Sequence, residues 1–295
     1  MKRIFATALA TASIVIASPL AAQRDFSEVE ITSEELAPGV AVLFGAGGNM
    51  AVSHGEDGTI LIDDQFAPLS EKIEGAVAYL GATPVKYVVN THWHGDHTGG
   101  NEHFGGTGAT IFAHHNVRVR MSSPQTRGER VTPPSPKAAL PVVTYERGVT
   151  LHLNGDPIDV VFVGGGHPDG DSIVRWREKN IVHMGDLYFK VPGWPFVDVE
   201  SGGDIEDLLY SLDSAINLMD EDTKVIPGHG HVSDRRELIA FRNIVGEAVT
   251  RIRALRDSGS SLEEAKALRP LDSFDRGEGF INEDRFIEAV WKSLN

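Results

Sequence analysis

"VVNTHWHGDHTGGN", residues 88–101, places three histidines and an aspartate within six residues, directly after an apolar run. The four donors are His92, His94, Asp96 and His97. On a tight loop that leaves a strand, alternate residues can converge on one point while their neighbours point elsewhere. This spacing suits two adjacent metal ions, the first taking His92 and His94 and the second taking the other pair. Because zinc usually needs four ligands, or three and a reactive water, the chain should supply about three more donors.

Three later segments each place one donor after an apolar run and small residues. The segments are VFVGGGHPDGDS with His167, IVHMGDLYF with Asp186, and VIPGHGHVS with His229. The chain contains no cysteine, so a thiolate ligand is excluded and any metal binds among nitrogen and oxygen donors. Two zinc ions per chain are the default for this donor set, with which iron and manganese are also compatible.

The first residues have the three parts of a secretory signal peptide. A basic start, MKR, precedes the uncharged run IFATALATASIVIA and the small-residue exit SPLAAQ. We predict a signal peptide at residues 1–22, cleaved between Ala22 and Gln23, and one folded domain at residues 23–295. A membrane anchor is the alternative, but the apolar run is short for a span of about twenty residues. Export to the periplasm, with no stable membrane anchor after cleavage, is therefore expected.

The composition is that of a globular protein with an acidic surface. The chain has 295 residues, of which 41% are hydrophobic and 23% charged, and its formal net charge is −15. Loss of Lys2 and Arg3 with the signal peptide would make this charge more negative. Such a domain repels phosphate backbones, so we expect no nucleic-acid partner and a small-molecule substrate instead. The sequence carries no signal for an oligomeric state.

Short apolar segments alternate with three helical patterns along the chain. Helices are predicted over residues 69–81, over residues 204–219, and from a capping box at Asp234 and Glu237 to about Gly259. The last of these has one apolar stripe, formed by Phe241, Val245, Ala248, Ile252 and Leu255. No linker divides the chain, so we predict a single α+β domain with helices packed on two sheets.

The order and spacing of these donors resemble the metallo-β-lactamase superfamily. The likeness spans about residues 35–235: H-x-H-x-D-H, a glycine-flanked histidine, G-D at a strand end, and P-G-H-G. The resemblance implies an αββα sandwich with two zinc ions between the sheets. It also implies the ligand sets: His92, His94 and His167 for the first metal, Asp96, His97 and His229 for the second, and Asp186 as the bridge.

Two branches of that superfamily are relevant. The best-known antibiotic-degrading branch has a cysteine where this chain has Asp186, whereas glyoxalase II, a thioester hydrolase, is similar in its ligand set. Glyoxalase II is typically intracellular, which disagrees with the predicted export. The segment FGAGGNMAVS, residues 44–53, is short and glycine-rich where lactamases have an apolar flap. Lys190 is near where some lactamases bind the substrate carboxylate, with an ordinary surface lysine as the alternative.

The implied chemistry is hydrolysis at a carbonyl group. Two adjacent metals lower the pKa of a bridging water from near 16 to about 7, and Asp96 would orient the resulting nucleophile. Asp63 or Asp64, and Asn90, would contact the ligand residues and fix their orientation without binding the metal themselves, with turn capping as the alternative. Trp93, Trp194 and Tyr188 are candidate groove residues, and core packing is their alternative.

Three functions remain open at this point. The leading hypothesis is a periplasmic dinuclear zinc hydrolase that opens β-lactam rings, at least those of penicillins, and so contributes to antibiotic resistance. The second is a thioesterase or lactonase of glyoxalase II type. The third is a metal-binding accessory protein without turnover, although an open coordination position favours catalysis.

Overall fold

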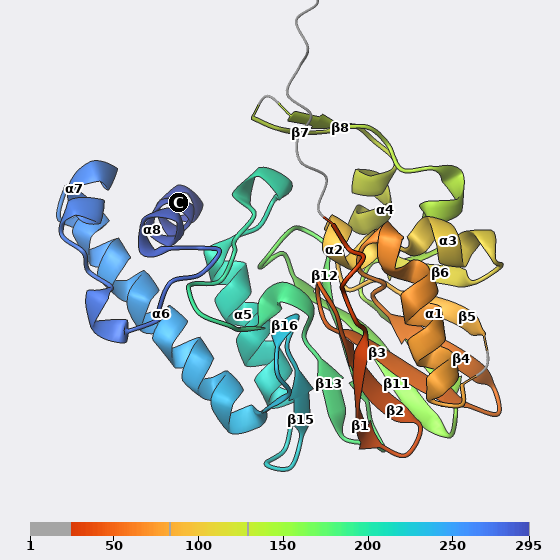
Figure 1. Cartoon of the computed structure of the whole chain (residues 1–295). Coiled ribbons are helices and arrows are strands. Elements are labelled where there is room, and N and C mark those ends of the chain that lie inside the picture. Colours follow the sequence, from red (N-terminus) through yellow and green to blue (C-terminus); the bar gives the residue numbers. More distant parts are fainter. Residues whose placement is uncertain (1–24, 83, 129, 295) are drawn as a thin grey trace, which may run out of the picture.

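The computed structural model describes residues 25–82, 84–128 and 130–294. The predicted signal peptide at residues 1–22 lies outside the described residues. Two large β-sheets face each other, and helices cover the outer face of each (Figure 1). Among the helices of the described residues, none is long and apolar enough to cross a membrane.

The first sheet has seven strands and contains the strand that leads into the histidine-rich stretch. Its order is β1 (Thr32–Ala37), β2 (Val40–Phe44), β3 (Met50–Gly55), β4 (Gly58–Ile62), β5 (Val85–Val89), β6 (Thr110–His114) and β9 (Val143–Tyr145). The strands from β1 to β4 pair antiparallel, and those from β4 to β9 pair parallel. Parallel strands covered on both faces are continuous apolar runs, as in β4, where all five residues are buried.

The second sheet has six strands and supplies the later donors. Its order is β10 (Gly148–Leu153), β11 (Asp156–Gly164), β12 (Asp171–Trp176), β13 (Ile181–His183), β15 (Lys224–Ile226) and β17 (Ser233–Asp234). Two separate two-stranded ribbons are formed by β14 (Phe189–Lys190) with β16 (His229–Gly230) and by β7 (Gln125–Arg127) with β8 (Arg130–Thr132). Between the sheets, side chains such as Ile62, Val89, Val160 and Trp176 form one buried cluster.

Helices on the outer faces complete the sandwich. The first sheet carries α1 (Ser70–Tyr79), α2 (Gly95–Thr98), α3 (Asn101–Gly106) and α4 (His115–Met121). The second carries α5 (Ile205–Asn217) and α6 (Arg235–Asp257), and α7 (Leu262–Ala267) and α8 (Glu283–Ser293) pack against these helices. Short 3₁₀ turns occur at η1 (Ala67–Leu69), η2 (Lys137–Ala139), η3 (Gly185–Leu187), η4 (Val199–Ser201) and η5 (Asp272–Phe274). The single-domain αββα sandwich predicted from the sequence is confirmed.

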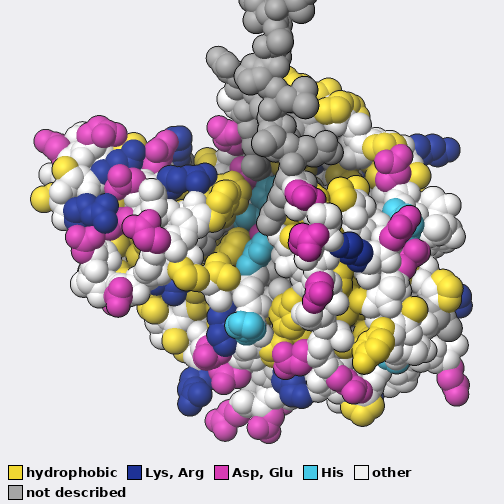
Figure 2. All heavy atoms as spheres, in the orientation of Figure 1, with side chains coloured by type: hydrophobic (Ala, Val, Ile, Leu, Met, Phe, Trp, Pro, Cys, Tyr) yellow, Lys and Arg dark blue, Asp and Glu magenta, His cyan; other side chains and the backbone are white. Residues whose placement is uncertain are grey.

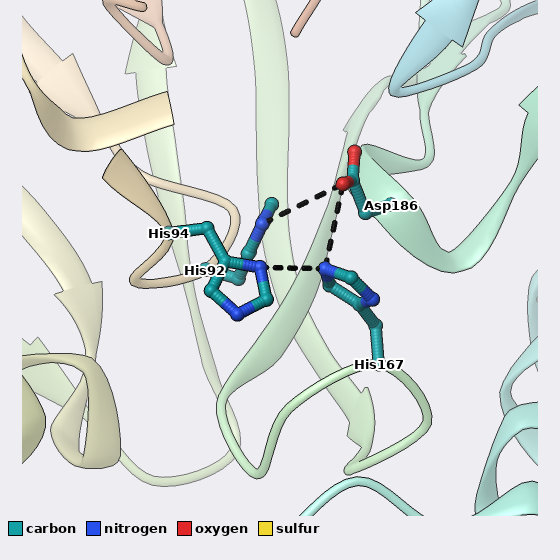
Figure 3. A group of neighbouring side chains, drawn as sticks. All are labelled: His92, His94, His167 and Asp186. Atoms are coloured by element: carbon teal, nitrogen blue, oxygen red, sulfur yellow. Dashed lines mark hydrogen bonds and ion pairs between the residues drawn. The ribbon is translucent and has the colours of Figure 1, made fainter. Parts of the chain in front are cut away.

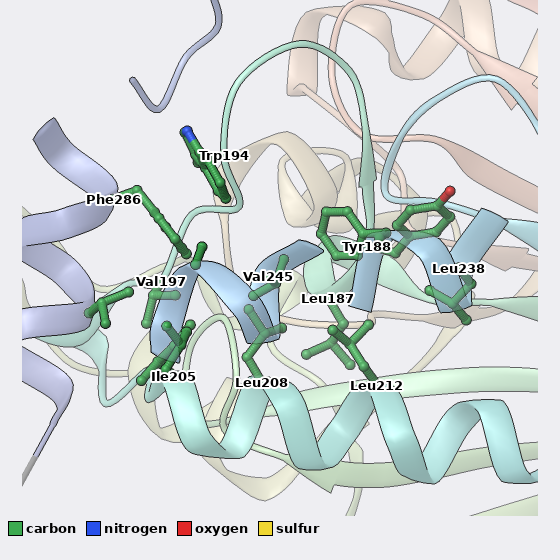
Figure 4. Packing of buried hydrophobic residues seen from close by; sticks show 14 of the residues in the cluster. Leu187, Tyr188, Trp194, Val197, Ile205, Leu208, Leu212, Leu238, Val245 and Phe286 are labelled. Atoms are coloured by element: carbon green, nitrogen blue, oxygen red, sulfur yellow. The ribbon is translucent and has the colours of Figure 1, made fainter. Parts of the chain in front are cut away.

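The largest apolar cluster joins α5 and α6 to the second sheet and to the segment that follows η3. Leu208 and Leu212 of α5 meet Val245 of α6, and Tyr188 and Trp194 pack into the same cluster (Figure 4). Both aromatic rings are therefore core residues. This packing fixes the chain between η3 and α5, which runs beside the donors.

Helix α6 begins as predicted, but its capping differs from the expected box. The Asp234 side chain accepts a hydrogen bond from the Glu237 amide at 2.8 Å. The Glu237 carboxylate does not return to the cap; it accepts from Ser233 Oγ and from Lys190 Nζ, both at 2.6 Å. The segment after Gly259, for which the sequence predicts no helix, forms α7 and α8, and α8 buries Phe286 and Val290.

Candidate metal centre

Each donor stands just beyond the end of a strand, at one edge of the sandwich. His92 and His94 follow β5, and His94 is the extended residue that precedes α2. His167 lies in the loop between β11 and β12, and Asp186 lies in η3 after β13. His229 opens β16, just after β15. The loops that follow strands of both sheets thus bring the donor residues together at one edge.

The first group of donors combines His92, His94, His167 and Asp186 (Figure 3). One candidate ligand atom from each lies within 4.8 Å of the others. His94 Nδ1 is 2.7 Å from His167 Nε2, and Asp186 Oδ2 is 3.4 Å from that same nitrogen. His92 Nε2 lies 3.8 Å from Asp186 Oδ2. The four side chains therefore surround one point.

The second group combines Asp96, His97 and His229, whose ligand atoms also lie within 4.8 Å of one another. His229 Nε2 is 3.4 Å from Asp96 Oδ2 and 3.4 Å from Asp186 Oδ2. His97 Nε2 is 3.1 Å from Asp186 Oδ1. Asp186 therefore stands between the two groups, and the structure brings all seven sequence-predicted donors together.

Unsatisfied buried atoms show that this arrangement fits a cation. Within the described residues, His92 Nε2, His97 Nε2 and Asp186 Oδ1 are buried and make no hydrogen bond. Such atoms are costly to bury unless a partner is bound, and a divalent cation provides one. Two glycines keep the space open: a Cβ on Gly48 would lie 2.1 Å from the His97 ring, and one on Gly228 would lie 2.1 Å from Asp186 Oδ1.

Asp63 orients two of the ligands from behind. Its Oδ2 lies 2.8 Å from His97 Nδ1 and accepts a hydrogen bond from Thr91 Oγ1 at 2.7 Å. Thr91 Oγ1 in turn lies 3.0 Å from His92 Nδ1. Asp63 is fully buried, so these contacts fix both ring orientations and leave the Nε2 atoms facing the donor groups.

The donors His94 and His167 are oriented by residues that the sequence does not single out. Asp198 Oδ2 lies 2.9 Å from His94 Nε2, and the Phe196 carbonyl lies 2.6 Å from His167 Nδ1. Both partners belong to the segment between β14 and α5. That segment has no periodic pattern or donor motif, so no local signal marks them.

Asn90 and Asp64 support the loop backbone instead of the ligand rings. Asn90 and Asn101 exchange side-chain hydrogen bonds at 3.0 and 2.9 Å. The Asp64 carboxylate accepts from the Gly100 amide at 2.8 Å, and the Asp64 amide donates to the His97 carbonyl at 2.9 Å. These contacts hold the turn that contains the histidine-rich stretch.

Lys190, the predicted substrate contact, is engaged elsewhere. Its ammonium donates to Glu237 Oε2 at 2.6 Å and to the Val232 carbonyl at 3.1 Å. It is not among the residues that line the cavity over the donors. Trp93 lines a neighbouring cavity of about 380 Å³ that also reaches His94.

The donors open into a cavity of about 460 Å³ with largely apolar walls. It is lined by Ala46, Phe66, His94, Gly95, Asp96, Asp186, Phe189, Val191, Phe196, His229 and Phe280. In the space-filling view, histidine side chains lie in a hollow of the surface beside apolar side chains (Figure 2). A cavity of this size holds a small molecule.

The two groups differ in the protonation of the metal-free chain. Burial lowers the pKa of His92, and burial together with His94 lowers the pKa of His167 to about 3. Burial acts in the same direction on His229, but the Asp186 carboxylate outweighs it and raises the pKa of His229 to about 9. Burial would raise the pKa of Asp96, but the positive charge of His97 outweighs it and holds the pKa at about 2.

Comparison with known proteins identifies the family. The sequence model of the protein family described as the Metallo-beta-lactamase superfamily matches residues 44–232, a range that contains all seven donors. The chain belongs to the metallo-beta-lactamase superfamily. A hydroxyacylglutathione hydrolase from Polaromonas sp. (strain JS666 / ATCC BAA-500) is 28% identical over 188 residues, which cover 63% of each protein. The chain thus spans less than two thirds of the length of that curated relative.

Solved structures of other superfamily members share the fold. DIM-1 metallo-beta-lactamase matches with a TM-score of 0.61 at 19% identity, covering 75% of this chain and 100% of that one. FIM-1 from Pseudomonas aeruginosa, solved in a mono-zinc form, matches with a TM-score of 0.59 at 20% identity, covering 74% and 96%. The matched family range contains both groups of histidine and aspartate donors, which together form a site that can hold divalent metal.

Proposed function

We propose that this superfamily member is a dinuclear zinc hydrolase that cleaves small carboxylic acid derivatives at the carbonyl carbon. The observation that carries the proposal is the shared carboxylate of Asp186. Its two oxygens face both donor groups, at 3.1 Å from His97 Nε2 and 3.4 Å from His167 Nε2. His92, His94 and His167 would hold one cation, Asp96, His97 and His229 would hold the other, and Asp186 is shared by both groups. Iron and manganese are the alternative occupants for these donors.

Divalent cations bound in such a site supply a hydroxide nucleophile at neutral pH and polarise the carbonyl group under attack. The residues of the chain then have distinct tasks. Asp186 holds the two halves of the site together. Asp96 has a side chain that is 29% exposed, and its low pKa keeps it ionised at neutral pH. It can therefore accept a hydrogen bond from the attacking water and align it with the carbonyl carbon.

β-Lactam ring opening, with penicillins as substrates, is the first candidate reaction. Two features support it: a cavity of about 460 Å³ suits a molecule of that size, and the predicted export would bring the enzyme to the compartment where penicillins act. Periplasmic location and a contribution to antibiotic resistance are parts of this proposal.

Thioester or lactone hydrolysis is the second candidate. The relative named hydroxyacylglutathione hydrolase favours it, as does a donor set made only of histidine and aspartate. Both candidates use the same attack on a carbonyl carbon and differ in the leaving group, which is an amide nitrogen for a lactam and a thiolate for a thioester.

Steady-state kinetics on the zinc-loaded domain separates these reactions. Benzylpenicillin and a lactoyl thioester are compared with and without a chelator, and the bound metal is counted by mass spectrometry. A chelator-sensitive kcat/KM above about 10⁴ M⁻¹s⁻¹ for penicillin supports β-lactam hydrolysis as a principal activity. A much lower value, with rapid thioester turnover, supports the second reaction. Failure to turn over either substrate despite two bound metals would support the accessory metal-binding role instead.

A further inference from the structure

Phe280 is a large apolar side chain that remains 72% exposed beside the metal centre. It lines the same cavity as Asp96, Asp186 and His229. An exposed apolar side chain at the rim of a cavity with convergent polar groups is a feature of ligand-binding surfaces. Phe280 also lies outside residues 44–232, so the family match does not account for it.

Phe196 connects Phe280 to the donor histidines. Its ring stacks on that of His94, with centroids 5.9 Å apart and an interplanar angle of 15°. It meets Phe280 edge-on at 5.8 Å and 85°. Its carbonyl also lies 2.6 Å from His167 Nδ1. One aromatic wall therefore runs from the metal ligands to the rim.

The segments that carry these two rings are fastened to each other. The Trp194 amide donates to the Ile281 carbonyl at 2.9 Å. The two backbones approach so closely at Gly279 that a Cβ there would lie 2.0 Å from a carbonyl oxygen of the facing segment. Such an approach requires a glycine. The wall is thus held by backbone contacts, independently of any ligand.

Arg285 of α8 fixes the position of the Phe280 ring. Its Nη1 donates to the Phe280 carbonyl at 2.8 Å, and its guanidinium lies 5.0 Å from the ring centroid. This cation–π arrangement covers part of one face of the ring and favours a single orientation at the rim.

Other residues that line the cavity are also apolar. The Phe189 ring stacks on His229 at 5.4 Å and 2°, and Phe66 and Val191 line the cavity as well. Among the described residues that line the cavity there is no lysine or arginine. The nearby Lys190 is paired with Glu237. The side chains that line the cavity therefore favour an apolar group, and the Arg285 guanidinium lies on the Phe280 ring at the rim.

We propose that the aromatic wall of Phe280 and Phe196, called the aromatic clamp below, determines substrate specificity by packing against an apolar group on the acyl side of the scissile bond. The favoured substrates are lactams or thioesters whose acyl substituent is aromatic or a branched hydrocarbon. Substrates with a small substituent are disfavoured. The clamp deepens the proposed hydrolase function and rests on it for the identity of the reacting bond.

Paired substrates test the clamp. Benzylpenicillin is compared with 6-aminopenicillanic acid, and a phenylacetyl thioester of N-acetylcysteamine with its acetyl thioester. Phe280→Ala should reduce kcat/KM for the phenylacetyl member of each pair about ten-fold, mainly through KM, because an apolar contact of about 1.4 kcal/mol is lost. The small members and the metal content should not change. Phe280→Tyr should restore the preference.

Tyr210→Ala is the matched control, since Tyr210 is an aromatic residue 65% exposed on α5. It should leave all ratios unchanged. An equal loss for large and small members of the pairs in Phe280→Ala would overturn the clamp, as would an unchanged preference.

Calorimetric binding of the hydrolysed products separates the clamp from the reaction. Benzylpenicilloate and its analogue without the phenylacetyl group are titrated into the zinc-loaded protein and into Phe280→Ala. If no substrate is turned over, the proposed reaction fails, but an approximately ten-fold weaker binding of benzylpenicilloate by the variant still supports the clamp. Equal binding by both proteins overturns it.

Discussion

The two halves of the metal centre are built from different chemistry although they share Asp186. The first half consists of His92, His94 and His167, all buried, and burial keeps His92 and His167 uncharged in the metal-free chain. The second half contains Asp96 and His229, whose side chains are 29% and 26% exposed. It holds charged groups that neutralise one another before any metal arrives.

This difference indicates how each half prepares for a cation. In the first half, burial keeps His92 and His167 neutral, so neither imidazole has to lose a charge when a cation binds. In the second half, burial is outweighed by Asp186, which raises the pKa values of His97 and His229. A metal entering there must replace protons. The first half is therefore preorganised, whereas the second exchanges protons for metal.

Removal of the shared carboxylate should have the largest effect, because it affects both halves at once. We expect Asp186→Asn to lose tight binding of both metals and to lower kcat/KM about a thousand-fold. Metal content after dialysis and steady-state kinetics measure this. Asp222→Asn, at an exposed aspartate, is the control. Two metals retained with full activity would show that Asp186 does not join the halves.

Lower pH should weaken the second half first. The pKa of His229 is raised to about 9 and that of His97 is also raised, so both are protonated at pH 7 in the metal-free chain. Affinity for the second metal should fall about ten-fold per pH unit for each proton displaced, as the pH decreases below 9. Affinity for the first metal should change much less between pH 8 and pH 6, because His92 and His167 are already neutral.

Competition with a chromophoric chelator across this pH range measures both constants. Parallel pH dependence of the two metals would contradict the distinction. The same comparison in the control Asp222→Asn should reproduce the wild-type slopes.

Substitution of the carboxylates that orient the histidine ligands, Asp198 and Asp63, should lower the affinity for one metal about ten- to a hundred-fold. Asp198→Asn should weaken the first metal through His94. Asp63→Asn should weaken mainly the second metal, because Asp63 contacts His97 directly and reaches His92 only through Thr91. Asp63 has a φ of 57°, which asparagine tolerates, so the substitution tests the charge without backbone strain. Metal titration of each variant measures the effect. An identical loss in both variants would mean that the two carboxylates act on the site as a whole.

The smallest effect is expected at Lys190, which follows Phe189; the Phe189 ring stacks on His229 of the second half. Because its ammonium is paired with Glu237, Lys190→Met should change KM for penicillin less than about two-fold. Glu237→Gln is the companion variant, since it frees the ammonium without removing it. A ten-fold rise in KM for Lys190→Met alone would restore the substrate contact predicted from the sequence.

The sequence indicates four of the donors through the spacing H-x-H-x-D-H after an apolar run, and the other three because each follows an apolar run and a small residue. Asp63 is predictable because it directly follows the apolar strand β4. Asp198 and Phe280 carry no such signal. Each acts through a contact with a residue far away in the chain, and neither lies in a periodic segment.

The sequence by itself determined the donor types, the absence of thiolate ligands, and a single α+β domain with helices packed on two sheets. These depend on residue identity and on short-range spacing. Only the tertiary structure decided which nitrogen of each histidine faces the centre, which side chain pairs with Lys190, and which rings form the cavity walls. Those features depend on contacts between segments far apart in the chain, such as Asp63 with His97, Asp198 with His94 and Phe196 with Phe280.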